Sequence, residues 1–246
     1  MGVFGSLRRP SYLERQANNL SQMILMWVDE SFDLMFPGGE SLFGGGTASL
    51  DGLTWVTGAN TVEIVDRAEV DSDTFYGEEL EFGIEVDLVH VGNTSFRGFF
   101  RIHRLGADGA PAALVATVLS RAVCVERTTL APRPMPERER LLEHCVTEPA
   151  MTVPQSHGDR PADAFLWTTA ARGTDCDGLG HLNNTKYATY GQEALEFAVA
   201  FGAFDADPAV AALAQQPITS LHIDCKLSPA PASLSSTKAP TKDSSV

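Results

Sequence analysis

The spacing of apolar residues changes from helical to strand-like near residue 50. Between Asn19 and Phe36, apolar side chains recur every three or four positions, and Pro37 ends the pattern. This spacing predicts a helix. Because residues 23–28 are apolar on every face, we expect other parts of the chain to enclose that helix.

Beyond the glycine-rich stretch 43–52, apolar and polar residues alternate, which predicts strands with one buried face. The expected strands are 62–70, 80–88, 96–105 and 112–127, and tight turns join most of them. One helix followed by four such strands predicts an α+β fold. In that fold an antiparallel sheet wraps around a long apolar helix.

A second, shorter unit follows a proline-punctuated linker. Its pattern predicts a strand at Phe165–Ala171, a helix at Asn184–Phe201 ending near Gly202, and a strand at Ile218–Leu227. The apolar stripe of this helix consists of Tyr187, Tyr190, Ala194, Phe197 and Phe201. Both units contain a helix, a loop and then a strand, so we interpret the chain as a tandem repeat with both outer ends trimmed.

The expected organisation therefore has five parts. They are a flexible N-terminus (1–10), a first unit without its opening strand (11–145), a linker (146–164), a partial second unit (165–228) and a disordered tail (229–246). A strand at a truncated edge has unpaired backbone groups. We therefore expect the 218–227 strand to lie beside the first unit or beside a second chain, and we expect a homo-oligomer.

Composition narrows the class of protein. The net charge of -14 disfavours nucleic acid as a partner, and no apolar run is long enough for a transmembrane segment. The four cysteines form no C-x-x-C pair, which favours a reducing, intracellular and cytoplasmic location. The opening MGVFGS also matches the pattern for N-myristoylation at Gly2, and an organelle-targeting peptide is an alternative interpretation.

The chemistry concentrates in RGTDCDGLGHLNNTKYATYGQEALEF, residues 172–197. Asp175 and Asp177 end the expected strand, glycines follow, and the next helix begins near Asn183 and Asn184. A helix N-terminus carries partial positive charge and unpaired N–H donors, which polarise a carbonyl oxygen placed there. A neighbouring aspartate then attacks that carbonyl or activates a water, so these are the parts of an acyl-transfer site.

Simpler interpretations remain open for each residue. Asn183 or Asn184 is a suitable N-cap, aspartates are common in turns, and His181 is compatible with a structural role. A metal site built on Cys176, Asp177 and His181 lacks a further strong ligand at suitable spacing. We therefore expect neither a metal nor a cofactor.

The motif TDCDGLGHLNNTKY…QEA resembles the D-x-D-x-x-G-H-x-N-N-x-x-Y…E-A signature of the hot-dog-fold thioesterases, the hydroxybenzoyl-CoA and acyl-ACP thioesterase group. In that fold a long helix is wrapped by an antiparallel sheet, which also matches the first unit. The resemblance covers Asn19 to about Leu227. It implies a double hot dog with an incomplete second unit.

The resemblance also implies roles for individual residues. Asp177 matches the catalytic carboxylate, as nucleophile or general base, and Asn184 matches the helix N-terminus that polarises the thioester carbonyl. The other matching positions, expected to shape the site or contact substrate, are Gly180, His181, Asn183, Tyr187 and Glu193. Leu179 departs from the plant acyl-ACP type, which has asparagine there. The first unit has no comparable acid.

The implied function is hydrolysis of an acyl-CoA or acyl-ACP thioester in fatty acid or other lipid metabolism. The alternative is an inactive hot-dog protein that binds acyl groups or serves in dimerisation. A hot-dog dehydratase expects a different His/Asp arrangement, which this sequence lacks.

Overall fold

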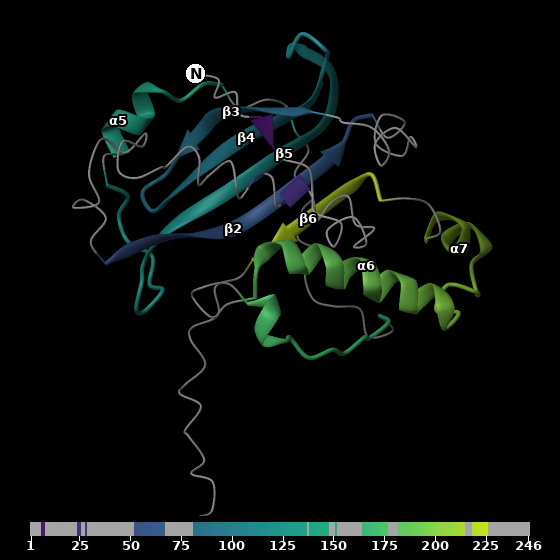
Figure 1. Ribbon diagram of the computed structural model, residues 1–246. Coiled ribbons are helices and arrows are strands. Elements are labelled where there is room, and N and C mark those ends of the chain that lie inside the picture. Colours follow the sequence, from purple (N-terminus) through teal and green to yellow (C-terminus); the bar gives the residue numbers. More distant parts are fainter. Residues whose placement is uncertain are drawn as a thin grey trace, which may run out of the picture.

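One antiparallel sheet forms the centre of the molecule. The computed structural model describes residues 6–7, 24–25, 28, 52–66, 81–136, 138–147, 151, 164–176, 182–214 and 218–225. Within them, six strands lie in the order β1-β3-β4-β5-β2-β6 (Figure 1). No helix in these ranges is long and apolar enough to cross a bilayer.

The strands and helices have the following bounds. The strands are β1 (Ser6–Leu7), β2 (Leu53–Ile64), β3 (Phe82–Val91), β4 (Ser95–Leu105), β5 (Pro111–Glu126) and β6 (Ser220–Asp224). The helices are α5 (Arg138–Glu143), the 3-10 turn η2 (Gly173–Asp175), α6 (Asn184–Ala200) and α7 (Pro208–Ala214). α5 lies beside β3, whereas α6 and α7 lie at the opposite edge, where α6 contacts β6 (Figure 1).

The alternating pattern located three of the four expected strands closely. β3, β4 and β5 follow one another through short turns and pair antiparallel, as predicted. β2 was placed wrongly, because it begins at Leu53 rather than at residue 62. The part of β2 before Val62 contains Thr54, Thr57 and Asn60, whose polar side chains obscure the apolar period, and a bulge at Gly58 interrupts it.

The N-terminus also differs from the expectation of a wholly flexible segment. Ser6 and Leu7 pair with Gly83 and Phe82 at the edge of β3. A strand edge presents unpaired N–H and C=O groups, so even a two-residue segment finds backbone partners there.

The main core lies on the face of the sheet that carries the helices. Ile24, Leu25 and Val28 are helical and at most 1% exposed, which confirms an enclosed helix at these three positions. The remaining buried members come from the sheet, together with Ala188 of α6: Val62, Phe82, Ile84, Val86, Phe100, Ile102, Val115, Ala116, Val118 and Ile223. The rest of the predicted long helix lies outside the described residues.

The C-terminal strand joins the same sheet. β6 pairs antiparallel with β2 over five residue pairs, which confirms that this strand lies beside the first unit. The strand predicted at Phe165–Ala171 was wrong, because these residues form no strand. Their aromatic side chain Trp167 packs on α6 instead, as described below. The tandem repeat and the homo-oligomer stay predictions.

The core makes a direct prediction about stability. Phe100 is fully buried at the centre of the sheet. Phe100→Ala removes most of that side chain and leaves a cavity, so we expect it to lower the free energy of unfolding by about 3–5 kcal/mol, measured by chemical denaturation. The control Val65→Ala, at a side chain that is 53% exposed, should change it by less than about 0.5 kcal/mol. Equal effects of the two substitutions would contradict this placement of the core.

Candidate active site

The N-terminus of α6 is formed by the two asparagines of the motif. Asn183 is the N-cap: its Oδ1 accepts hydrogen bonds from the Thr185 backbone N–H at 2.9 Å and from the Thr185 hydroxyl at 2.8 Å. Its own backbone N–H donates to the carbonyl of Asp175 at 2.8 Å. The sequence left open which asparagine caps the helix, and the structure assigns Asn183 to that role.

The chain before the helix closes back on itself. Cys176 and Leu182 form an isolated antiparallel bridge, next to the Asn183–Asp175 hydrogen bond. The two ends of the segment 177–181 therefore meet at the first turn of α6. Asp177, Gly180 and His181 belong to that segment and lie outside the described residues.

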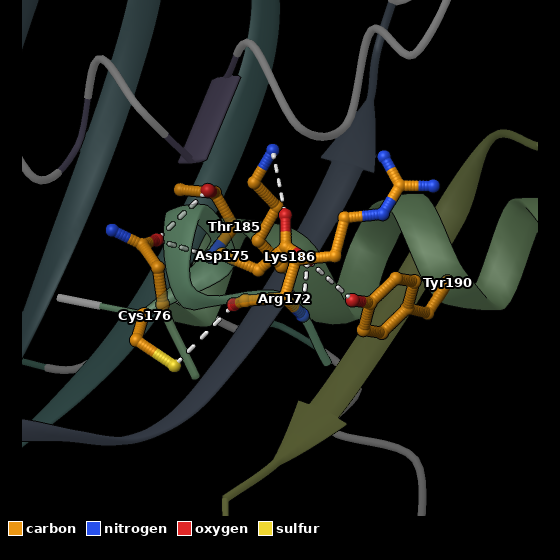
Figure 2. Close-up of polar contacts among 7 residues, drawn as sticks. Arg172, Asp175, Cys176, Thr185, Lys186 and Tyr190 are labelled. Atoms are coloured by element: carbon orange, nitrogen blue, oxygen red, sulfur yellow. Dashed lines mark hydrogen bonds and ion pairs between the residues drawn. The ribbon is translucent and has the colours of Figure 1, made fainter. Parts of the chain in front are cut away.

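Asp175 is a structural carboxylate. Its Oδ2 accepts hydrogen bonds from the Arg172 backbone N–H at 2.8 Å and from the Tyr190 hydroxyl at 2.9 Å, and Lys186 lies 3.8 Å from Oδ1 (Figure 2). The Arg172 N–H, followed by the Tyr190 hydroxyl and Lys186, lowers the pKa of Asp175. The hydrogen bond that the Tyr190 hydroxyl donates to Asp175 raises the pKa of Tyr190. A carboxylate held ionised by these donors is a poor base, so Asp175 anchors the turn.

β2 contacts the start of α6. The Asn184 Nδ2 donates to the Thr57 hydroxyl at 3.1 Å, which joins the start of α6 to the sheet. Immediately after Thr57, Gly58 forms the bulge and its carbonyl accepts from the Cys225 backbone N–H at 3.0 Å. A Cβ at Gly58 would lie 2.9 Å from Arg121 Nε and from Val123 Cγ2, so only glycine fits this bulge without a shift.

Tyr187 and Glu193 occupy different parts of α6. Tyr187 is 41% exposed in the first turn, and partial burial, followed by the nearby Cys225 thiol, raises the pKa of its phenol. Glu193 is partly buried nine residues after Asn184. At about 1.5 Å per residue, its backbone lies roughly 14 Å along the helix from the N-terminus. The structure therefore brings Asn183, Asn184 and Tyr187 together and leaves Glu193 about two and a half turns away.

The aromatic stripe of α6 is not the buried face of the helix. The buried residues are Thr185, Ala188 and Ala198, whereas Phe197 is 43% and Phe201 is 75% exposed. Trp167 stacks on Phe197 at a centroid distance of 5.8 Å and contacts Tyr190 edge-on at 6.0 Å. Small side chains allow the helix to approach the sheet closely, whereas Phe197 and Phe201 stay largely exposed.

No group of three or more His, Cys, Asp or Glu side chains suited to a metal occurs among the residues that the structure describes. Within the site itself, the Cys176 thiol contacts the carbonyl of Arg172 at 3.7 Å. This contact places Cys176 in the turn (Figure 2). Asp177 and His181, the other two members of the metal alternative, lie outside the described ranges.

Comparison with known proteins identifies the fold. No protein-family model and no curated protein sequence matches the chain. Among solved structures, one described as an oleoyl thioesterase from Lactobacillus plantarum superimposes with a TM-score of 0.55 at 16% identity, covering 77% of this chain and 69% of that one. The fold is hot-dog-like. The resemblance to hot-dog thioesterases that the motif suggested is thereby confirmed at the level of the fold.

Two acyl-ACP thioesterases extend the likeness. The 12:0-ACP thioesterase of Umbellularia californica has a TM-score of 0.53 at 16% identity and covers 79% of this chain and 75% of its own. The acyl-ACP thioesterase of Bacteroides thetaiotaomicron also has a TM-score of 0.53, at 14% identity, and covers 81% of this chain and 75% of its own. At such identities the likeness concerns architecture rather than substrate.

Sequence reasoning missed the contribution of β2. Thr57 and Gly58 lie more than 100 residues before the motif, and only the β2–β6 pairing brings them beneath it. The available signal was Gly58 inside an otherwise strand-like segment, since such a glycine commonly marks a bulge or a close approach of two backbones.

The anchoring role of Asp175 predicts a pH-dependent stability effect. Its pKa in the folded protein is lowered, so the ionised carboxylate stabilises the fold at neutral pH and this contribution is lost as the pH falls below about 4. Asp175→Asn should therefore lower the Tm at about pH 7, and the difference from the parent should shrink toward zero at about pH 3. The control Glu139→Gln, at a side chain that is 85% exposed, should leave the Tm unchanged. A difference in Tm that stays constant with pH would refute an ionised anchor.

Proposed function

We propose that the protein hydrolyses acyl thioesters, with Asp177 as the catalytic carboxylate and the N-terminus of α6 as the site that polarises the thioester carbonyl. The observation that carries this proposal is the closed turn at the start of α6. Cys176 is bridged to Leu182, and Asn183 caps the helix while its N–H binds Asp175. Asp177 follows Cys176 in sequence and His181 precedes Leu182. The Cα atom of each therefore lies about 3.8 Å from the Cα atom of a bridge residue.

The helix N-terminus supplies the electrostatic part of the reaction. The backbone N–H dipoles of its first turn sum to a partial positive charge, which stabilises the negative charge that develops on the carbonyl oxygen during attack. The Asn184–Thr57 hydrogen bond fixes the first turn against the sheet, so these donors are held in position before substrate arrives. We propose that Gly180, which has no side chain, lets the protein backbone approach the substrate closely, and that His181 and Tyr187 help to shape the same site.

Asp177 supplies the remaining step by one of two routes. As a general base it takes a proton from water, whose oxygen bonds to the carbonyl carbon. As a nucleophile its carboxylate oxygen forms that bond, and water then cleaves the resulting anhydride. Both routes break the carbon–sulfur bond, and the thiolate leaves and takes up a proton. The products are a carboxylic acid and a free thiol.

Asp175 does not compete for this role. The donors from Arg172 and Tyr190 occupy its carboxylate and lower its pKa, whereas an effective base has a pKa near the working pH. The fold supports the assignment to this class of reaction, since thioesterases share it. We propose either CoA or acyl-carrier protein as the thiol carrier, and the shared pantetheine arm makes both compatible with one site.

The decisive substitution is Asp177→Asn, which keeps the side-chain volume and removes the charge. We expect it to lower kcat on acyl-CoA or acyl-ACP substrates by about a hundredfold or more, measured by thiol release, because the base or nucleophile is lost. His181→Ala should have a smaller effect, through the shape of the turn.

Asp175→Asn is the matched control, because it removes a charge two residues away in the same turn. At about pH 7 and well below its own Tm, it should retain most of the activity. Full activity of folded Asp177→Asn would refute the assignment of the catalytic residue. An inactive parent that still binds acyl-CoA saturably would instead support the non-hydrolytic acyl-binding alternative.

A further inference from the structure

A buried amide in β2 is not explained by the fold. Asn60 is 1% exposed, and its Oδ1 has no hydrogen-bond partner among the residues that the structure describes. Leaving a buried acceptor unpaired costs about 1–3 kcal/mol. Such groups are rare in folded proteins, and each calls for an explanation.

Strand register places this amide on the face of the sheet that carries α6. Asn60 pairs with Ser120 on one side and with Ile223 on the other. Side chains two apart along a strand share a face, and Val62 and Ile223 both belong to the helix-facing core, as does Ala188 of α6. Asn60 therefore stands on the same face.

Its position along the strand is next to the candidate active site. Asn184, at the start of α6, is bonded to Thr57, whose β5 partner is Ala122, whereas the β5 partner of Asn60 is Ser120. The two positions differ by two β5 residues, or about 7 Å. Ala188, one turn after Asn184, belongs to the same core cluster as Ile223. Asn60 thus lies beneath the first turns of α6, between its polar start and the apolar core.

Asn60 is a polar residue at the edge of the apolar part of this sheet face. Ser120, directly opposite, is also 1% exposed, and directly opposite Cβ atoms are about 4.5–5.5 Å apart. Along this face of the sheet, the residues change from polar at Thr57, Asn60 and Ser120 to apolar at Val62 and Val118. A plain hydrocarbon chain on this face would have no donor for the Asn60 amide.

We propose that Asn60 is a specificity-determining residue that binds a hydroxyl on the acyl group of the substrate, so that the preferred substrates are 3-hydroxyacyl thioesters rather than unsubstituted fatty acyl thioesters. This inference rests on the proposed function for the position of the thioester at the start of α6. If the thioester carbonyl lies near Thr57, a hydroxyl two carbons beyond it falls within the distance of about 7 Å that separates Thr57 from Asn60 along the sheet. It donates to Oδ1 and leaves its own oxygen available to Ser120.

The pantetheine arm carries another donor, its amide N–H. That arm must reach the surface, where it joins a nucleotide or a carrier protein. Asn60 is 1% exposed and packed beside Ile223 and Val62, so its surroundings match the acyl side of the thioester. A pantetheine contact would be shared by all substrates and would give no preference among acyl groups.

The test measures binding of pantetheine thioethers, which are not hydrolysed, with and without a hydroxyl at the position of acyl C3, in short, medium and long chains. We expect the parent to bind the hydroxylated member of the best pair about tenfold more tightly by titration calorimetry. Asn60→Leu has a similar volume and no amide. It should reduce the ratio of the two Kd values to about one, mainly by weakening the hydroxylated ligand.

Stability provides a second readout, which separates this role from a structural one. Asn60→Leu removes an unpaired buried acceptor, so its Tm should be equal to or higher than that of the parent. The matched control is Thr61→Val, the next residue on the same strand but on the opposite face, where the Thr61 hydroxyl and His222 Nδ1 are hydrogen-bonded at 2.8 Å. It should lower the Tm and leave the ligand preference intact.

The outcomes separate the inference from the proposed function, because binding requires no turnover. No preference in the parent, no binding of either ligand, or equal weakening of both ligands by Asn60→Leu would overturn the role of Asn60. Asn60→Ala, which removes the amide without adding bulk, provides the same comparison if the leucine variant does not fold. Loss of hydrolysis in the parent with an intact binding preference would overturn the hydrolase proposal alone.

Discussion

The backbone ladder between β2 and β6 joins segments separated by about 160 residues, and the candidate site depends on it. Residues 59–63 pair with residues 220–224, and the Cys225 N–H continues the ladder to the Gly58 carbonyl. In the described sheet β2 is thereby paired on both sides, with β5 and β6. Burying a strand without such pairing would leave its N–H and C=O groups unsatisfied, so this ladder fixes where the C-terminal segment lies. α6, which precedes β6, is held over the same face.

Polarity inside β2 is the second consequence of this arrangement. A strand that serves only as core carries apolar residues on its inner face, as β3 and β5 do over most of their length. β2 instead presents Thr57 and Asn60 beneath α6, on either side of the Gly58 bulge. The bulge shifts the alternation by one residue, so that both side chains stand on the inner face. Such departures from local rules concentrate at functional sites, where stability is exchanged for recognition.

The turn before α6 holds Asp175 in a network of hydrogen bonds. Asp175 is held by a backbone N–H and a tyrosine hydroxyl, and it supports the Asn183 cap through its carbonyl. This network closes the base of the segment 177–181 at a helix N-terminus. The outer face of the helix carries the stack of Trp167, Phe197 and Phe201. The aromatic residues thus fix the preceding segment to α6 rather than α6 to the sheet.

The amino-acid sequence by itself determined much of the local structure. Period-two alternation identified β3, β4 and β5, and helical spacing with Gly202 beyond its end identified α6. The positions of Asp177 and Asn184 predicted an acyl-transfer site, and the resemblance of the motif to hot-dog thioesterases made this a prediction of thioester chemistry. These features are local, because each depends on residues within one element or one turn. The tertiary structure decided which face of α6 is buried, because that depends on how closely the helix approaches the sheet. It also decided that Thr57 and Asn60 lie beneath the motif, because only the pairing of strands far apart in the chain brings them there.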